Sequence, residues 1–340
     1  MEGQILSLPK PISAGILLSY RCTSNCKHCM YACSPNWKSD WISMKDADKI
    51  LNQLADKIQG SPFGPDKIDI NRGLHFTGGE PFLNFELLLK ITDLASKLKI
   101  PSTFVETNCF WCKDDETTRS KLTQLKDAGL NGILISVNPF ILEQVPFEKT
   151  ERGFRISSEI FGENAIIYQD LFYNIFKLLK LKDTLTFEEF LKKSPDSLQY
   201  VELIPMGRAV YKIGHLFRKQ KAKHFFNLSC KGELARDWHV HIDNYGNYMT
   251  GYCGGISLGD AKNLNLILEG INLDEFPILN AIITDLKQLY TIGVEQFGYK
   301  ERNEGYISKC HLCVDIRRQI VQQTDKFKEL KPKEFYYNLE

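Results

Sequence analysis

Residues 20–34 read Y-R-C-T-S-N-C-K-H-C-M-Y-A-C-S and place Cys22, Cys26 and Cys29 in the spacing C-x-x-x-C-x-x-C. Three thiolates on one short loop can bind three irons of a cubane cluster. The fourth iron then has no protein ligand and is an open coordination site for a small molecule. The same three cysteines are also compatible with part of a zinc knuckle. The stretch therefore predicts a metal or cluster loop.

The overall composition is that of an ordinary globular enzyme. The chain has 340 residues, enough for one large domain and a smaller second one. Lys+Arg 43 balance Asp+Glu 42 for a net charge of +1, so no strong field attracts nucleic acid or an anionic membrane. No apolar segment near the start resembles a secretion signal, and no run of about 18 apolar residues is present. We therefore expect a soluble cytoplasmic protein.

The ten cysteines of the chain fall into three groups. The groups are Cys22, Cys26, Cys29 and Cys33, then Cys109 and Cys112, then Cys230, Cys253, Cys310 and Cys313. Without an export signal a disulfide framework is disfavoured. Close thiol pairs then favour metal or cluster ligands.

Repeated β-α units are predicted in the first 140 residues. Short apolar runs predict strands at 15–20, 73–76, 103–106 and 132–137. Helical spacing predicts helices at 43–59, 84–98 and 117–128, the first with Ser43 as N-cap. This order predicts an α/β fold with a parallel sheet covered by helices, either doubly wound or a barrel. The strand ends on one edge would carry the cysteine loop, T-G-G-E-P-F at 77–82, T-N-C at 107–109 and S-V-N at 136–138.

The later part of the chain predicts a second, smaller domain. Strands at 165–168 and 198–204 with a helix at 171–182 would complete the sheet, and the basic run at 217–223 suggests a boundary. Residues 238–253 alternate around Asn-Tyr-Gly-Asn, as a β-hairpin does. Helices are expected at 274–286 and 313–328. We expect domains at 1–216 and 217–340.

The motif C-T-S-N-C-K-H-C after a first strand, with T-G-G-E-P at the end of the next, resembles the radical S-adenosylmethionine superfamily over residues 14–210. The resemblance implies a partial (β/α)6 barrel of the TIM type and a [4Fe-4S] cluster held by Cys22, Cys26 and Cys29. S-adenosylmethionine would close the open iron through its amine and carboxylate. It would accept an electron, supplied by a donor of the flavodoxin or ferredoxin type, and yield a 5′-deoxyadenosyl radical that removes a hydrogen atom from substrate.

The resemblance also assigns cofactor contacts to the strand ends. Gly78 and Gly79 would let the backbone approach a ligand without a Cβ, and strand-end carbonyls or the Glu80 carboxylate would accept from the methionine amine. His28 would lie near the adenine, or be a surface histidine. The remaining expected contacts are Pro81, Thr107, Asn108, Ser136 and Asn138. Asn138 stands where the family often has an acidic residue.

Cys230, Cys253, Cys310 and Cys313 form a second set that can saturate one more [4Fe-4S] cluster or bind a structural zinc. Cys230, the hairpin and Cys253 resemble the start of SPASM/twitch auxiliary-cluster domains. The resemblance implies an α+β domain with one twitch-like auxiliary cluster and a C-terminal helix, because SPASM domains need more cysteines.

Several reactive residues keep alternative interpretations. Cys109 and Cys112 are candidate catalytic thiols that donate a hydrogen atom, form a redox dithiol or bind another metal; otherwise they are buried small hydrophobes. His239, His241 and Asp243 alternate along one strand and are a candidate acid/base or metal group, or a hydrogen-bonded polar face. Arg208 is a candidate carboxylate ligand, or forms a surface salt bridge. Cys33 has no assigned task.

The sequence thus predicts a radical enzyme that oxidises, crosslinks or epimerises a peptide or protein. A small-molecule dehydrogenase or epimerase is the alternative, and a non-catalytic zinc-binding protein is the alternative of another class. The chain before Ser13 is too short for a peptide-recognition domain, which favours the small-molecule alternative or a separate leader-binding partner.

Overall fold

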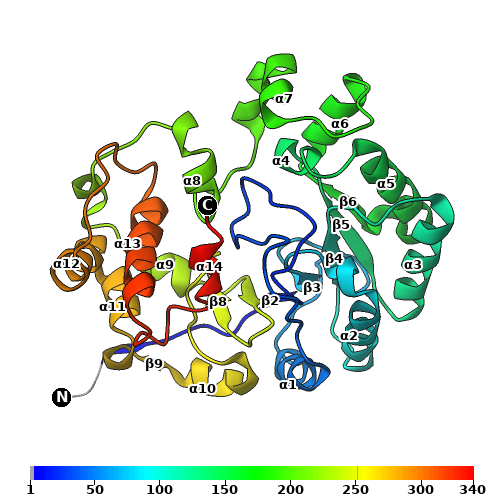
Figure 1. Ribbon diagram of the computed structural model, residues 1–340. Helices are drawn as coiled ribbons and strands as arrows, with labels where there is room; N and C mark the ends of the chain where they lie inside the picture. Colours follow the sequence, from blue (N-terminus) through cyan, green and yellow to red (C-terminus); the bar gives the residue numbers. More distant parts are fainter. Residues whose placement is uncertain (1–3, 251) are drawn as a thin grey trace. The chain divides into compact units, whose positions relative to one another are not determined.

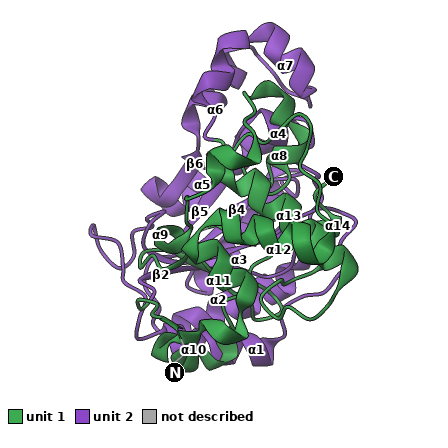
Figure 2. Ribbon diagram, turned by 90° about the vertical axis from the view of Figure 1, so that its left-hand side faces the viewer, with its two compact units in different colours: residues 1–10, 27–32, 203–340 green, residues 11–26, 33–202 purple. Residues whose placement is uncertain are grey.

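The computed structural model describes residues 4–250 and 252–340. Residues 1–3 of the first predicted domain and residue 251 of the predicted hairpin stretch lie outside the described residues. Two compact units are present (Figure 2): the N-terminal unit comprises Pro11–Cys26 and Cys33–Glu202, and the C-terminal unit comprises Leu203–Glu340, Lys27–Ala32 and the described residues up to Lys10. The division thus falls between 202 and 203, whereas the sequence places a boundary between 216 and 217.

A parallel sheet forms the centre of the N-terminal unit. Among the residues that the structure describes, its strands lie in the order β6-β5-β4-β3-β2. They are β2 (Ser13–Leu17), β3 (Gly73–Thr77), β4 (Thr103–Thr107), β5 (Gly132–Ser136) and β6 (Ala165–Tyr168). Each pairs in parallel with its neighbour, for example Leu17 opposite Thr77, so that all carboxyl ends meet at one edge. The α/β prediction is confirmed.

Helices cover this sheet and begin at the capping residues that the sequence supplies. They are α1 (Met44–Leu54), α2 (Phe85–Lys97), α3 (Asp115–Asp127), α4 (Pro139–Leu142), α5 (Phe147–Phe161), α6 (Asp170–Leu178) and α7 (Phe187–Lys193). The side chains of Ser43, Asn84 and Asp114 accept hydrogen bonds from the first turns of α1, α2 and α3. Helices α2, α3 and α5 lie along one face of the strands (Figure 1).

One prediction for this unit is wrong, and one helix was missed. The strand expected at 198–204 is wrong, because Pro195–Tyr200 form a 3-10 helix; Pro195 lacks an N–H and fixes φ, which favours the start of such a turn. Helix α5 was not predicted at all. The described part of the unit therefore has one strand fewer than the predicted six.

The C-terminal unit combines short strands with helices, as predicted for an α+β domain. Strand β1 (Ile5–Leu6) pairs antiparallel with β9 (Ile271–Asn272), and β7 (Val240–Ile242) with β8 (Tyr248–Thr250) in the predicted hairpin. The helices are α8 (Ala209–Lys212), α9 (Lys231–Leu234), α10 (Leu264–Glu269), α11 (Pro277–Thr284), α12 (Leu286–Phe297), α13 (Lys309–Gln323) and α14 (Glu334–Tyr337). Helix α13 starts before the predicted 313, because Ser308 caps it. None of the described helices is long and apolar enough to cross a membrane.

Candidate functional site

The cysteine loop leaves the carboxyl end of β2 and returns beside it. The Cys22 N–H donates to the Ser34 carbonyl (3.1 Å), and the Ser34 N–H donates to the Tyr20 carbonyl (3.3 Å). Tyr20 stacks on Trp37 with ring centroids 4.3 Å apart. Cys22 and Cys33 are buried, whereas Cys26 and Cys29 are partly exposed. The base of the loop is therefore fixed, while Cys26 and Cys29 remain accessible.

Asn108 connects the end of β4 to this loop. Its Nδ2 donates to the hydroxyl oxygens of Ser24 (3.2 Å) and Thr23 (3.4 Å) and to the sulfur of Cys22 at 3.9 Å. Hydrogen bonds to ligand sulfurs help to set the reduction potential of iron–sulfur clusters. Asn108, a predicted cofactor contact, thus lies against a predicted cluster ligand.

Glu80 braces the ends of β3 and β4. Its buried carboxylate accepts hydrogen bonds from the Thr107 hydroxyl (2.9 Å), the Asn108 N–H (2.9 Å) and the Phe82 N–H (3.2 Å). Burial raises the pKa of Glu80 to about 7, although these hydrogen bonds oppose the rise. Pro81 is buried at the start of a 3-10 helix, Pro81–Asn84. The predicted contact of the Glu80 carboxylate with a ligand amine would have to compete with three internal donors.

Gly78 and Gly79 are required by the protein's own backbone. A Cβ on Gly78 would lie 2.4 Å from the Ser19 carbonyl oxygen, and one on Gly79 would lie 1.9 Å from that of Arg21. The Gly79 N–H also donates to the Ser19 carbonyl (2.8 Å). We expected these glycines to make room for a ligand. Their absent side chains allow the end of β3 to contact the base of the cysteine loop, and the ligand contact stays a prediction.

The end of β5 carries Ser136 and Asn138. Ser136 is half-buried and lies opposite Tyr168 in the strand register. The Asn138 side chain accepts from the N–H groups of Phe140 and Ile141 and so caps α4. Asn138 therefore has a structural role at the position where the resemblance expects an acidic cofactor contact.

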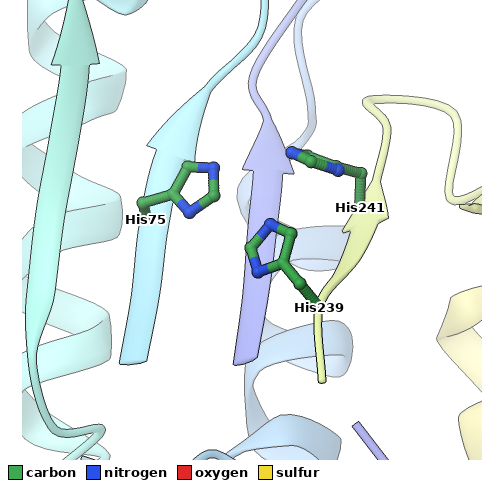
Figure 3. Close-up of side chains that lie close together, drawn as sticks. All are labelled: His75, His239 and His241. Carbon is green, nitrogen blue, oxygen red and sulfur yellow. The ribbon is translucent and has the colours of Figure 1, made fainter. Parts of the chain in front are cut away.

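A polar group on β3 and β4 was missed by the sequence analysis. The Glu106 carboxylate accepts from the Thr77 hydroxyl (2.6 Å) and lies 3.6 Å from the Nε2 atom of His75. His75 (Figure 3) stacks on Phe104, and burial lowers its pKa to about 3, so the imidazole is neutral. The Glu106 side chain remains about 30% exposed, and burial raises its pKa. The available signal was a carboxylate within the apolar strand T-F-V-E-T.

Cys109 and Cys112 are both fully buried. A Cβ built on Gly153 of α5 would lie 2.6 Å from the Cys109 sulfur and 3.1 Å from that of Cys112, so this glycine packs directly on both thiols. The hydrogen bond with Cys112 and burial raise the pKa of Cys109 well above its ordinary value. These facts favour the interpretation as buried small side chains over that as catalytic thiols.

In the C-terminal unit, Arg208 holds the segment Lys27–Ala32. Its N–H donates to the Cys29 carbonyl (3.0 Å), and its guanidinium donates to the carbonyls of Ala32 (2.7 Å) and Asn338 (3.1 Å). Arg208 is fully buried and bonds main-chain oxygens, which argues against the surface salt bridge. Burial and the charge of Arg208 lower the pKa of His28 to about 4, so that His28 is neutral at pH 7.

The predicted row of polar residues on the hairpin divides into two parts. His239 directly precedes β7, and His241 lies within it (Figure 3). Their ring centroids are 4.7 Å apart, and His241 Nδ1 lies 2.9 Å from the Tyr31 hydroxyl. Asp243 instead accepts from the N–H groups of Tyr245 and Asn247 and closes the turn. The two histidines share a polar face, while Asp243 is a turn residue.

The second cysteine set converges within the C-terminal unit. Cys230 precedes α9, Cys253 follows β8, and Cys310 and Cys313 lie on the first turn of α13. All four line one cavity, whose other walls are mostly apolar. Burial and then the neighbouring thiols raise the pKa of Cys230, and burial raises that of Cys310 to about 12. Mutual electrostatic interaction of this kind requires that the sulfurs lie close together.

Three solved structures are similar to this chain at low sequence identity. The crystal structure of BtrN in complex with AdoMet and 2-DOIA is similar to this chain with a TM-score of 0.45 and 12% identity, covering 81% of this chain and 88% of that chain. Native anSMEcpe with bound AdoMet gives a TM-score of 0.44 and 14% identity over 96% of this chain and 95% of that chain. The crystal structure of Streptococcus suis SuiB bound to precursor peptide SuiA gives a TM-score of 0.31 and 15% identity, covering 82% of this chain and 65% of that chain.

No curated protein sequence matches the chain significantly. The family model of the 4Fe-4S single cluster domain matches residues 15–145. This segment contains the cysteine loop, the Gly78–Glu80 turn and Asn108. The match confirms the predicted [4Fe-4S] domain in the part of the chain whose motifs resemble the radical S-adenosylmethionine superfamily.

Proposed function

We propose that this protein is a radical S-adenosylmethionine enzyme whose catalytic [4Fe-4S] cluster is bound by Cys22, Cys26 and Cys29. The observation that carries the proposal is the position of the C-x-x-x-C-x-x-C loop at the carboxyl end of β2, within the segment that matches a single-cluster domain. Three thiolates are the donor set that a cubane with one open iron requires. Cys22, Cys26 and Cys29 therefore fit a [4Fe-4S] cluster with one open iron.

When reduced, such a cluster supplies one electron that cleaves S-adenosylmethionine into methionine and a 5′-deoxyadenosyl radical, which then takes a hydrogen atom from substrate. The chain's own residues prepare this chemistry. Asn108 donates toward the Cys22 sulfur, and Glu80 with Thr107 fixes the strand end that carries Asn108. His28, next to Cys29, is the residue that the resemblance places near the adenine.

We further propose that Cys230, Cys253, Cys310 and Cys313 hold a second, fully ligated [4Fe-4S] cluster. The four side chains line one mostly apolar cavity, and four thiolates are the donor set that saturates a cubane. The same donor set also fits a structural zinc ion, and metal analysis of the purified protein separates the two. The second cluster would accept an electron from the substrate radical or anchor the substrate.

The proposed substrate is a peptide or protein that is oxidised, crosslinked or epimerised, with an electron donor of the flavodoxin or ferredoxin type. The support is the resemblance of the C-terminal cysteine set to twitch-type domains, which often occur in peptide-modifying enzymes. Product analysis after incubation with a candidate peptide or an aminocyclitol distinguishes this class from small-molecule chemistry, because only the true substrate accelerates formation of 5′-deoxyadenosine.

Anaerobic reconstitution tests the cluster assignment. We expect about eight irons per chain and formation of 5′-deoxyadenosine with dithionite as reductant. Cys26→Ala should abolish this cleavage, because one cluster ligand is lost. Cys33→Ala is the matched control from the same loop and should retain it. Zinc with negligible iron, or wild-type cleavage by Cys26→Ala, would refute the proposal.

A further inference from the structure

Arg317, on α13, is a buried charge in the cavity of the four cysteines. It lies one turn beyond Cys313 and is 4% exposed. Of the described residues that line the cavity, Arg317 alone carries a full charge. Burial of an unpaired guanidinium is costly, so a buried arginine normally faces an anion.

The protein satisfies only part of this guanidinium. One nitrogen, Nη1, donates to the Gly254 carbonyl (3.1 Å) and to the Tyr336 hydroxyl (2.8 Å). Tyr336 in turn donates to the Gly255 carbonyl (2.6 Å). The buried Nε atom has no hydrogen-bond partner among the described residues. Among the described residues no carboxylate bonds this guanidinium; its charge interacts with Tyr336, Cys313 and Cys253, and it also forms a hydrogen bond with Cys313.

Neighbouring charges point to the same conclusion. Lys309 also lies near the thiols, but it is partly exposed and forms a salt bridge with Glu233. Arg318, the next residue of the helix, is not among the described residues that line the cavity and pairs with Glu340. Arg317 is therefore the buried cation of this cavity that lacks a carboxylate partner.

We propose that Arg317 is the counter-ion of the second [4Fe-4S] cluster and raises its reduction potential. This inference rests on the second cluster proposed above. A cubane with four thiolates carries two negative charges when oxidised and three after it gains one electron. A fixed positive charge stabilises the reduced state more, which makes reduction easier.

The test uses a full-length parent in which Cys22, Cys26 and Cys29 are all alanine, so that only the second cluster can form. After anaerobic reconstitution we expect about four irons per chain. The cluster is titrated with dithionite in the presence of redox mediators, and the reduced fraction is read by electron paramagnetic resonance. Each reduction moves one electron from dithionite to one cluster.

Arg317→Met should lower the ratio of reduced to oxidised cluster about tenfold at the parent's midpoint, which for a one-electron couple is about 59 mV. Arg317→Lys keeps the charge and should stay near the parent. Arg318→Met removes one positive charge from the same helix outside the cavity and should leave the potential unchanged.

The outcomes separate the two proposals. Four irons with an unchanged potential in Arg317→Met would overturn the role of Arg317 and leave the second cluster intact. Zinc without iron in the parent would overturn the second cluster and this inference with it. If Arg317→Met loses its iron, the Arg317→Lys variant provides the test. Iron retained by Arg317→Lys at the parent's reduction potential supports a charge effect of Arg317, and loss of iron from Arg317→Lys overturns it.

Discussion

Gly153→Ala, made alone and together with Cys109→Ala, tests whether the paired thiols are structural. The new methyl group would lie 2.6 Å from the Cys109 sulfur and 3.1 Å from that of Cys112. Overpacking of this kind costs about 1–3 kcal/mol. Alanine in place of glycine in a helix returns about 1 kcal/mol. The single variant should therefore be destabilised by up to about 2 kcal/mol.

The second substitution removes the closest obstacle. In the Cys109→Ala background the nearest remaining sulfur is that of Cys112, and Gly153→Ala should become neutral or slightly stabilising. The expected coupling free energy is therefore about 1–3 kcal/mol. Urea unfolding of the reduced apoprotein, followed by tryptophan fluorescence, gives the free energy of unfolding of the wild type, the two single variants and the double variant. The left-handed backbone of Cys109 (φ 62°) is no worse for alanine than for cysteine.

Gly232→Ala is the matched control, because a Cβ on this helical glycine meets nothing within 4 Å. It should be neutral or stabilising by up to about 1 kcal/mol in both backgrounds. Equal destabilisation by Gly153→Ala with and without the Cys109 sulfur would refute the packing that we describe. Such a result would restore the interpretation of Cys109 as a thiol that faces substrate.

Two further variants test the strand-end contacts. Glu80→Gln should flatten the pH dependence of the free energy of unfolding. The pKa of Glu80 is about 7 in the folded state and 4.5 in its ordinary state, so the protonated carboxyl stabilises the fold below pH 4.5. This stabilisation, up to about 3 kcal/mol, is lost as the pH rises through 7. Urea midpoints of wild type and variant between pH 5 and 8 measure it, and parallel slopes would contradict the assignment. Asn108→Ala removes the donor to the Cys22 sulfur and should weaken iron retention about tenfold or more in competition with a chelator. Asn25→Ala, at an exposed position of the same loop, is the control and should retain iron like the wild type. Equal iron retention by Asn108→Ala and wild type would contradict this role of Asn108.

Local signals explain what the sequence predicted correctly. The strands β2 to β6 are short apolar runs, and the caps Ser43 and Asn84 stand directly before helical spacing. Because parallel strands end at one edge, the neighbourhood of the cysteine loop and Asn108 also followed from chain order. The four C-terminal cysteines were likewise grouped by spacing and number alone.

Contacts between distant residues explain the failures. Gly153 disfavours a helix by its intrinsic propensity, and its close packing against the Cys109 and Cys112 sulfurs in helix α5 is a contact over about 40 positions that the sequence does not show. The hydrogen bonds that the Glu80 carboxylate accepts from Thr107 and Asn108, more than 25 positions away, could likewise not be read from the sequence. The contact of a strand-end carbonyl or of Glu80 with a ligand amine stays a prediction. Arg317 was not singled out, since nothing in its own helix shows that its guanidinium lines the cysteine cavity.

The hydrogen bonds of Arg208 have an evolutionary consequence. Cys29 belongs to the metal-binding motif near the start of the chain, but its carbonyl and that of Ala32 accept hydrogen bonds from a residue 176 positions beyond Ala32. A recombination event that replaced everything after residue 202 would keep every cysteine of the motif and lose this donor. Any exchanged segment would have to bring its own arginine after a glycine that fits against Met30. The main chain of the C-x-x-x-C-x-x-C motif therefore depends on a donor from the C-terminal part of the chain.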